Sequence, residues 1–110
     1  MVGIRTSIVR WVDDEQPGWV ECTFVDDLGN EHLVREKAPV VSSASLHAGS
    51  QYPQPGIIGC TVIRRHRTAD GQEVVSVDTE LPWGIQSVEG RSRFDVRAES
   101  LVEFPHEPAG

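Results

Sequence analysis

A period-two alternation of apolar and polar residues, broken repeatedly by glycine and proline, is the feature that most constrains this chain. In WVECTFV, residues 19–25, the side chains of Val20, Cys22 and Phe24 fall on one side of an extended chain and the intervening ones on the other. Successive side chains of a strand point to opposite faces, whereas a helix repeats every ~3.6 residues. The pattern therefore predicts strands.

Turn sequences divide these alternating runs into hairpins. DDLGN joins WVECTFV to EHLVREK, and TADGQ joins IIGCTVIRRHR to EVVSVDTE. Glycine beside Asp, Asn or Gln is typical of tight connections between antiparallel strands. Another strand is expected over residues 4–12, where β-branched residues precede the turn sequence DDEQPG.

The remaining segments give weaker indications. The Glu89-Gly90 turn predicts a third hairpin that pairs residues 85–88 with residues 92–96. A run at residues 100–104 is expected to close the sheet. Residues 41–50 are the one segment expected to hold a short helix.

These short strands without long helical segments predict an all-β fold. At 110 residues the chain is one domain by size. We expect residues 1–104 to form a small antiparallel β-barrel, SH3-like or OB-like, of about five to seven strands, with a frayed tail at residues 105–110. A small β-sandwich is the alternative.

The net charge of the chain limits the kinds of partner that it is expected to bind. Ten Lys and Arg against seventeen Asp and Glu give a net charge of -7. Such a field disfavours general binding to nucleic acid and to anionic membranes, which rely on clustered cations. It favours a basic protein partner, although solubility explains the charge equally well.

Features that would place the chain outside the cytoplasm are missing from the sequence. The amino-terminal residues show no export signal, and no run of about 18 apolar residues occurs. Cys22 and Cys60 are therefore expected to be reduced in a cytoplasmic protein. Each shares its strand face with apolar residues, so burial in the core is expected rather than a nucleophilic role.

Signatures of catalysis and cofactor binding are also missing. The sequence contains no G-x-S-x-G, G-x-x-x-x-G-K-S/T or G-x-G-x-x-G motif, and its four histidines lack metal-ligand spacing. We therefore expect no enzyme activity, no cofactor and no bound metal.

The sequence IRRHR, residues 63–67, is the one basic cluster. On a strand, Arg65 and Arg67 point to one side, and Arg64 and His66 point to the other. An anion site for phosphate, a nucleic-acid strand or an acidic peptide is one interpretation. The other is cross-strand pairing of these arginines with acidic residues of the returning strand, Glu73 and Asp78.

Two aromatic residues on stiff loops complete the candidate binding surface. Trp83 lies in the loop of residues 82–84, where Pro82 fixes the backbone and Gly84 permits a reversal. Its indole is expected either to cover one end of the barrel or to anchor a partner. Tyr52, in QYPQPG, presents the same alternatives.

The sequences VECTFVDDLGNEHLVREKAPVV, YPQPGIIGC and VDTELPWGIQSVEG resemble small bacterial β-domains of unknown function. The resemblance extends over most of the chain. It implies a stand-alone bacterial cytosolic protein and assigns no activity and no functional residue.

Two classes of function follow. The first is a non-enzymatic binding or interaction domain, such as an acidic, immunity-like inhibitor of a basic protein, with self-association also open. The second is a small-ligand or anion binder, or a weak enzyme, that uses residues 64–67 with the 82–84 loop.

Overall fold

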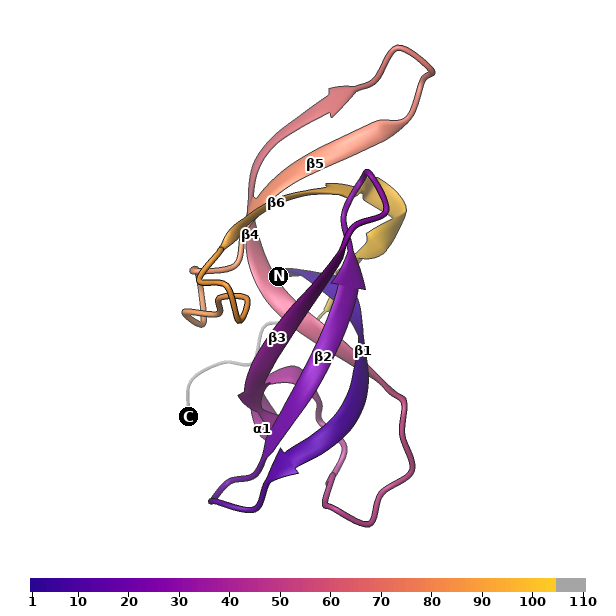
Figure 1. Ribbon diagram of the computed structural model, residues 1–110. Coiled ribbons are helices and arrows are strands. Elements are labelled where there is room, and N and C mark those ends of the chain that lie inside the picture. Colours follow the sequence, from indigo (N-terminus) through magenta and orange to yellow (C-terminus); the bar gives the residue numbers. More distant parts are fainter. Residues whose placement is uncertain (105–110) are drawn as a thin grey trace.

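A computed structural model describes residues 1–104 and shows one antiparallel sheet curled into a half-barrel (Figure 1). The elements are β1 (Val2–Asp13), β2 (Trp19–Val25), β3 (Glu31–Lys37), α1 (Ala38–Val41), β4 (Gln54–Arg67), β5 (Glu73–Asp78), β6 (Arg93–Arg97), the 3-10 helix η1 (Ala98–Ser100) and β7 (Leu101–Glu103). The strand order is β3-β2-β1-β4-β5-β6, and β7 pairs with β1.

Two long strands organise the sheet. One edge of β1 pairs with β4, and its other edge pairs first with β7 and then with β2. The first half of β4, up to Cys60, lies against β1, and its second half, from Thr61, lies against β5. The register of β4 shifts after Val62, and such bulges bend a strand. The chain therefore passes from one half of the sheet to the other along a single curved strand.

The core fills the concave side of this sheet. Its fully buried side chains are Ile4, Ile8, Ile58, Ile85, Val20, Val34, Val75, Val77, Val96, Thr79 and Cys22. Burial of each large apolar side chain stabilises the fold by about 1.5–3 kcal/mol relative to exposure. The Phe24 and Phe94 rings meet edge to face with centroids 5.0 Å apart. This contact joins β2 to β6 across the core.

Hydrogen bonds bring the two ends of the sheet together. The backbone N–H of Asp27, in the β2–β3 turn, donates to the carbonyl of Asp95 on β6 at 2.9 Å. The N–H of Val88, in the loop before β6, donates to the carbonyl of Leu33 on β3 at 2.9 Å. Loop and turn contacts thus partly cover strand edges that would otherwise be exposed.

The structure confirms the predicted fold class. The sheet is antiparallel, has seven strands and contains the hairpins β2–β3 and β4–β5 at the expected turns. It is one curled sheet rather than the two facing sheets of a sandwich. The expected tail, residues 105–110, lies outside the described residues.

The helix prediction for residues 41–50 is wrong. The only α-helix in the part of the chain that the structure describes is α1, which ends where that segment begins. Pro39 lies in its first turn, where a missing N–H is tolerated and a fixed φ favours helix formation. Ser42 then returns to an extended conformation and ends the helix.

The third hairpin is also wrong as predicted. The Glu89-Gly90 turn is present, with Gly90 at φ +81°, but β6 pairs with β5 rather than with residues 85–88. Phe94 pairs with Val77, so the β5 pairing gives β6 an apolar partner across the strands. Residues 85–88 instead form a loop in which Ile85 and Ser87 are buried and Gln86 and Val88 are exposed.

Candidate functional site

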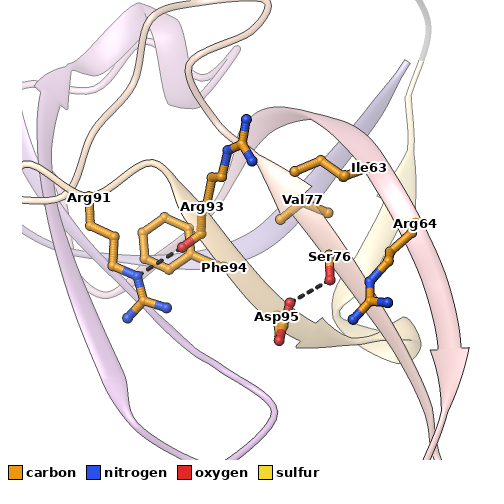
Figure 2. Close-up of a pocket in the computed structure, with 8 residues that line it drawn as sticks. All are labelled: Ile63, Arg64, Ser76, Val77, Arg91, Arg93, Phe94 and Asp95. Carbon is orange, nitrogen blue, oxygen red and sulfur yellow. Dashed lines mark hydrogen bonds between the residues drawn. The ribbon is translucent and has the colours of Figure 1, made fainter.

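A solvent-open hollow of about 280 Å³ lies where β4, β5 and β6 run side by side (Figure 2). It is lined by Ile63, Arg64, Ser76, Val77, Arg91, Arg93, Phe94 and Asp95. Three of these eight residues are arginines, in a chain with an overall charge of -7. The hollow is therefore a local concentration of positive charge on an acidic protein.

A β-bulge on β4 gives Arg64 its place in the hollow. Val62 pairs with Val77, but Arg64 pairs with Ser76, the next residue back along β5, so Ile63 is an extra residue. An extra residue reverses the alternation of side chains beyond it. Val77 is fully buried, whereas Arg64 is exposed. Without the bulge, Arg64 would share the core-facing side with Val62.

Ser76 and Asp95 line the hollow on neighbouring strands. They are directly paired across β5 and β6, and the Ser76 hydroxyl donates a 2.6 Å hydrogen bond to Asp95 Oδ1. Arg64, Ser76 and Asp95 therefore form one row across three strands. Figure 2 shows the Arg64 and Arg91 side chains on opposite sides of the Ser76–Asp95 hydrogen bond.

The loop before β6 holds Arg91. The backbone N–H groups of Ser87 and Gly90 donate to the carbonyls of Arg91 and Ser87, each at 2.8 Å. Arg91 Nε donates to the Arg93 carbonyl at 2.8 Å, and its Cζ lies 5.0 Å from the Phe94 ring centroid. The stacking and the hydrogen bond fix this guanidinium and leave its Nη groups for another acceptor.

The arginines differ in how far they are neutralised. Arg93 Nε lies 3.6 Å from Asp78 Oδ2, whereas Arg64 and Arg91 form no ion pair within residues 1–104. Three guanidinium charges against the carboxylates of Asp78 and Asp95 leave one unit of positive charge. An oxyanion fits this arrangement, since guanidinium groups bind carboxylate and phosphate oxygens with directed N–H donors.

The lining contains no partner that would activate Ser76 as a nucleophile. The Ser76 hydroxyl bonds Asp95, and no histidine is among the eight lining residues. Both thiols are free and buried, and desolvation raises the pKa of Cys22 to about 12 and that of Cys60 to about 11. The groups that the hollow does offer are the N–H donors of its guanidinium groups.

None of the predicted residues of the basic arm beyond Arg64 lines the hollow. Arg65 Nη1 lies 3.2 Å from Glu73 Oε1, and Arg67 Nη1 donates to the Gly71 carbonyl at 3.1 Å. His66 is half-buried opposite Val74, and its Nδ1 has no hydrogen-bond partner within residues 1–104. Both Arg65 and Arg67 are thus engaged by contacts within the β4–β5 hairpin.

The two predicted aromatic residues lie elsewhere. The Trp83 ring packs over Gly59 and lies 5.8 Å from the Phe104 ring, with 39% of its surface exposed. The Tyr52 hydroxyl donates to the His47 carbonyl at 2.8 Å, and its ring packs against the core. Neither residue lines the hollow.

Sequence reasoning missed Arg91, Arg93, Ser76 and Asp95. The sequence did contain an indication of these residues, because Arg91 and Arg93 are two positions apart, just before and at the start of β6. Because this strand was predicted to pair with residues 85–88 rather than with β5, its proximity to Arg64 was not recognised.

Within residues 1–104, no three His, Cys, Asp or Glu side chains converge in a way that would hold a metal ion. The described helices are all too short or too polar to cross a bilayer.

The chain matches no protein-family model, and no significant match is found among curated proteins or solved structures.

Proposed function

We propose that this chain is a non-enzymatic binding domain that recognises an oxyanion on a partner protein through the hollow between Arg64 and Arg91. The observation that carries the proposal is the position of two guanidinium groups without carboxylate partners in residues 1–104 on either side of Ser76 (Figure 2). Overall charge of -7 favours a protein over a nucleic acid or an anionic bilayer as the partner.

Inorganic phosphate is the probe that tests this proposal. Phosphate is expected to raise the midpoint of thermal unfolding in a saturable way, because a ligand that binds only the folded state stabilises it. Arg64→Ala is expected to weaken phosphate binding about tenfold, as loss of a charge-assisted hydrogen bond predicts. Isothermal titration calorimetry measures both affinities.

Arg65→Ala is the matched control, because Arg65 is the next residue on β4 but is paired with Glu73 outside the hollow. Its phosphate affinity is expected to stay at the wild-type value. Equal losses in the two variants, or equal stabilisation by chloride at matched ionic strength, would contradict the proposal.

An acidic inhibitor of a basic protein is the second candidate. The β1–β2 turn presents Asp13, Asp14 and Glu15 at the surface, and the whole chain carries a charge of -7. This candidate predicts salt-sensitive binding of an oligolysine peptide that is weakened by Asp14→Asn combined with Glu15→Gln. Unchanged binding in that double variant would remove it.

Oligomeric state and cellular location are part of the same proposal. Two unpaired thiols suit a reducing compartment, so we assign the protein to the cytoplasm. Size-exclusion chromatography with and without a captured partner distinguishes self-association from binding to another protein.

A further inference from the structure

A second cation-lined hollow, of about 320 Å³, lies on the half of the sheet formed by β1, β2 and β3. It is lined by Arg10, Trp11, Val12, Asp13, Trp19 and Arg35. It shares no lining residue with the hollow of Arg64 and Arg91. Its chemistry differs as well, because the indole ring of Trp19 lies two residues from Glu21 on the same face of β2.

A bulge on β1 assembles this hollow. Ile8 pairs with Cys22, and Arg10 pairs with Glu21, so Val9 is an extra residue. The extra residue moves Arg10 from the side of buried Ile8 to the opposite side, where Glu21 lies. Glu21 pairs in turn with Arg35 on β3. Arg10, Glu21 and Arg35 therefore form a row across three strands.

Buried Glu21 holds the two arginines side by side. Its Oε1 accepts from Arg10 Nε at 2.6 Å and its Oε2 accepts from Arg35 Nη2 at 2.8 Å. The Glu21 side chain is only 5% exposed, whereas Arg10 and Arg35 are 65% and 56% exposed. One carboxylate thus orients two guanidinium groups whose remaining N–H donors face solvent.

The next row supplies a flat apolar surface. Trp19 pairs with Asp13 on one side and with Lys37 on the other, and Lys37 Nζ lies 5.7 Å from the indole centroid. The lining cations Arg10 and Arg35 are matched by the anions Glu21 and Asp13, and Lys37, outside the lining but over the Trp19 ring, adds one positive charge. A ligand with a single negative charge complements this surface, whereas a phosphate dianion exceeds it.

We infer that this hollow binds a carboxylate carried on a flat aromatic ring, with the carboxylate on the paired guanidinium groups and the ring against Trp19. The inference does not rest on the proposed function of the Arg64 hollow. The volume lies at the lower end of the range for small-ligand sites, about 300–1,000 Å³. A free aromatic acid and a peptide that ends in phenylalanine share this chemistry.

Benzoate is the probe, and NMR signals of the Trp19 indole N–H and the Arg35 Nε–H report where it binds. Saturable shifts at both groups are expected. Benzamide lacks the charge and cyclohexanecarboxylate lacks the flat ring, so each is expected to bind at least about tenfold more weakly than benzoate. Equal affinities for the three compounds, or no saturation with benzoate, would overturn the inference.

Arg35→Gln and Trp19→Leu are expected to weaken benzoate binding by about tenfold or more. Arg5→Gln on the same sheet is the matched control, because exposed Arg5 lies outside the hollow. A Trp83 indole signal unchanged from wild type verifies that each variant is folded, because Trp83 lies outside the hollow. Arg64→Ala is expected to bind benzoate normally, so this test fails or succeeds independently of the phosphate test.

A short peptide ending in phenylalanine, compared with benzoate, shows whether the natural ligand is a chain terminus or a free aromatic acid. Tighter binding of the peptide than of benzoate identifies a chain terminus as the ligand, and weaker binding identifies a free acid. If wild-type affinity for both persists in Arg35→Gln, the inference is wrong.

Discussion

Arg64 lies directly across from Ser76, although simple alternation from Val62 would place the two side chains on opposite faces of the sheet. The single extra residue Ile63 causes this relationship. A similar extra residue, Val9, places Arg10 beside Glu21. In both halves of the sheet a bulge therefore moves an arginine into a cation-lined hollow.

Asp95→Asn is expected to tighten phosphate binding to the Arg64 hollow about threefold to tenfold, because it removes a negative charge from the lining with little change in side-chain shape. The amide oxygen still accepts the hydrogen bond from Ser76. Calorimetric titration measures the change, and Asp70→Asn, at the tip of the β4–β5 hairpin, is the control. Weaker binding in Asp95→Asn would mean that the carboxylate itself takes part in recognition.

Gly59→Ala is expected to displace the Trp83 ring, because a Cβ at residue 59 would lie 2.8 Å from two of its carbon atoms. The ring is on a loop and partly exposed, so we expect a modest loss of about 1–2 kcal/mol in the free energy of unfolding. A red shift of tryptophan fluorescence is expected to accompany it. In a Trp83→Ala background the same substitution is expected to cost much less, and an unchanged cost would show that the ring is not the obstacle.

Asp26 is expected to make the free energy of unfolding depend on pH in the acidic range. Burial alone would raise its pKa, but hydrogen bonds from His32, Asn30 and Leu28 outweigh burial and lower it from 3.8 to about 2. Because the folded pKa is the lower one, the stabilisation is present above pH ~4 and is lost as pH falls toward ~2. It amounts to about 2–3 kcal/mol at ~1.4 kcal/mol per pKa unit.

Urea unfolding at a series of pH values measures this dependence. Asp26→Asn is expected to be less stable than wild type above pH ~4 and to show a flatter decline toward pH ~2. Glu89→Gln, at the exposed turn before β6, is the comparison that separates loss of the buried hydrogen bonds from loss of a charge. A decline as steep in Asp26→Asn as in wild type would exclude Asp26 as its source.

Cys22 and Cys60 are expected to be unreactive in the folded protein. Both are buried, and their raised pKa values of about 12 and about 11 leave little thiolate at neutral pH. An aromatic disulfide reagent at pH ~8 is expected to label neither thiol until denaturant is added, when both react. Fast labelling of native protein at one thiol would indicate an open path to that sulfur.

The strands of the β2–β3 and β4–β5 hairpins were predictable because each carries its own alternation and borders a glycine-containing turn. WVECTFV and EHLVREK match β2 and β3 residue for residue. α1 was not predictable from apolar periodicity, because four residues are too few to show a helical repeat. Its position depends on Pro39 and on the packing of Val41 in the core.

The candidate site was less predictable than the fold. Arg64 was recognised as part of a basic arm, but its pairing with Ser76 depends on a bulge that requires knowledge of the partner strand. Arg91 and Arg93 depend on which edge β6 joins, a long-range choice that local alternation does not specify. Arg65 and Arg67 stood out in the sequence because they lie in the basic cluster of residues 63–67, but in the structure both make contacts within the β4–β5 hairpin.

Phosphate titration followed by NMR at the arginine Nε–H groups tests the central claim most directly, because each arginine reports separately. We predict saturable shifts for Arg64 and Arg91, with Arg65 and Arg67 unchanged. Shifts confined to Arg65 and Arg67, or a uniform drift of all arginine signals with ionic strength, would contradict the bulge-positioned anion site.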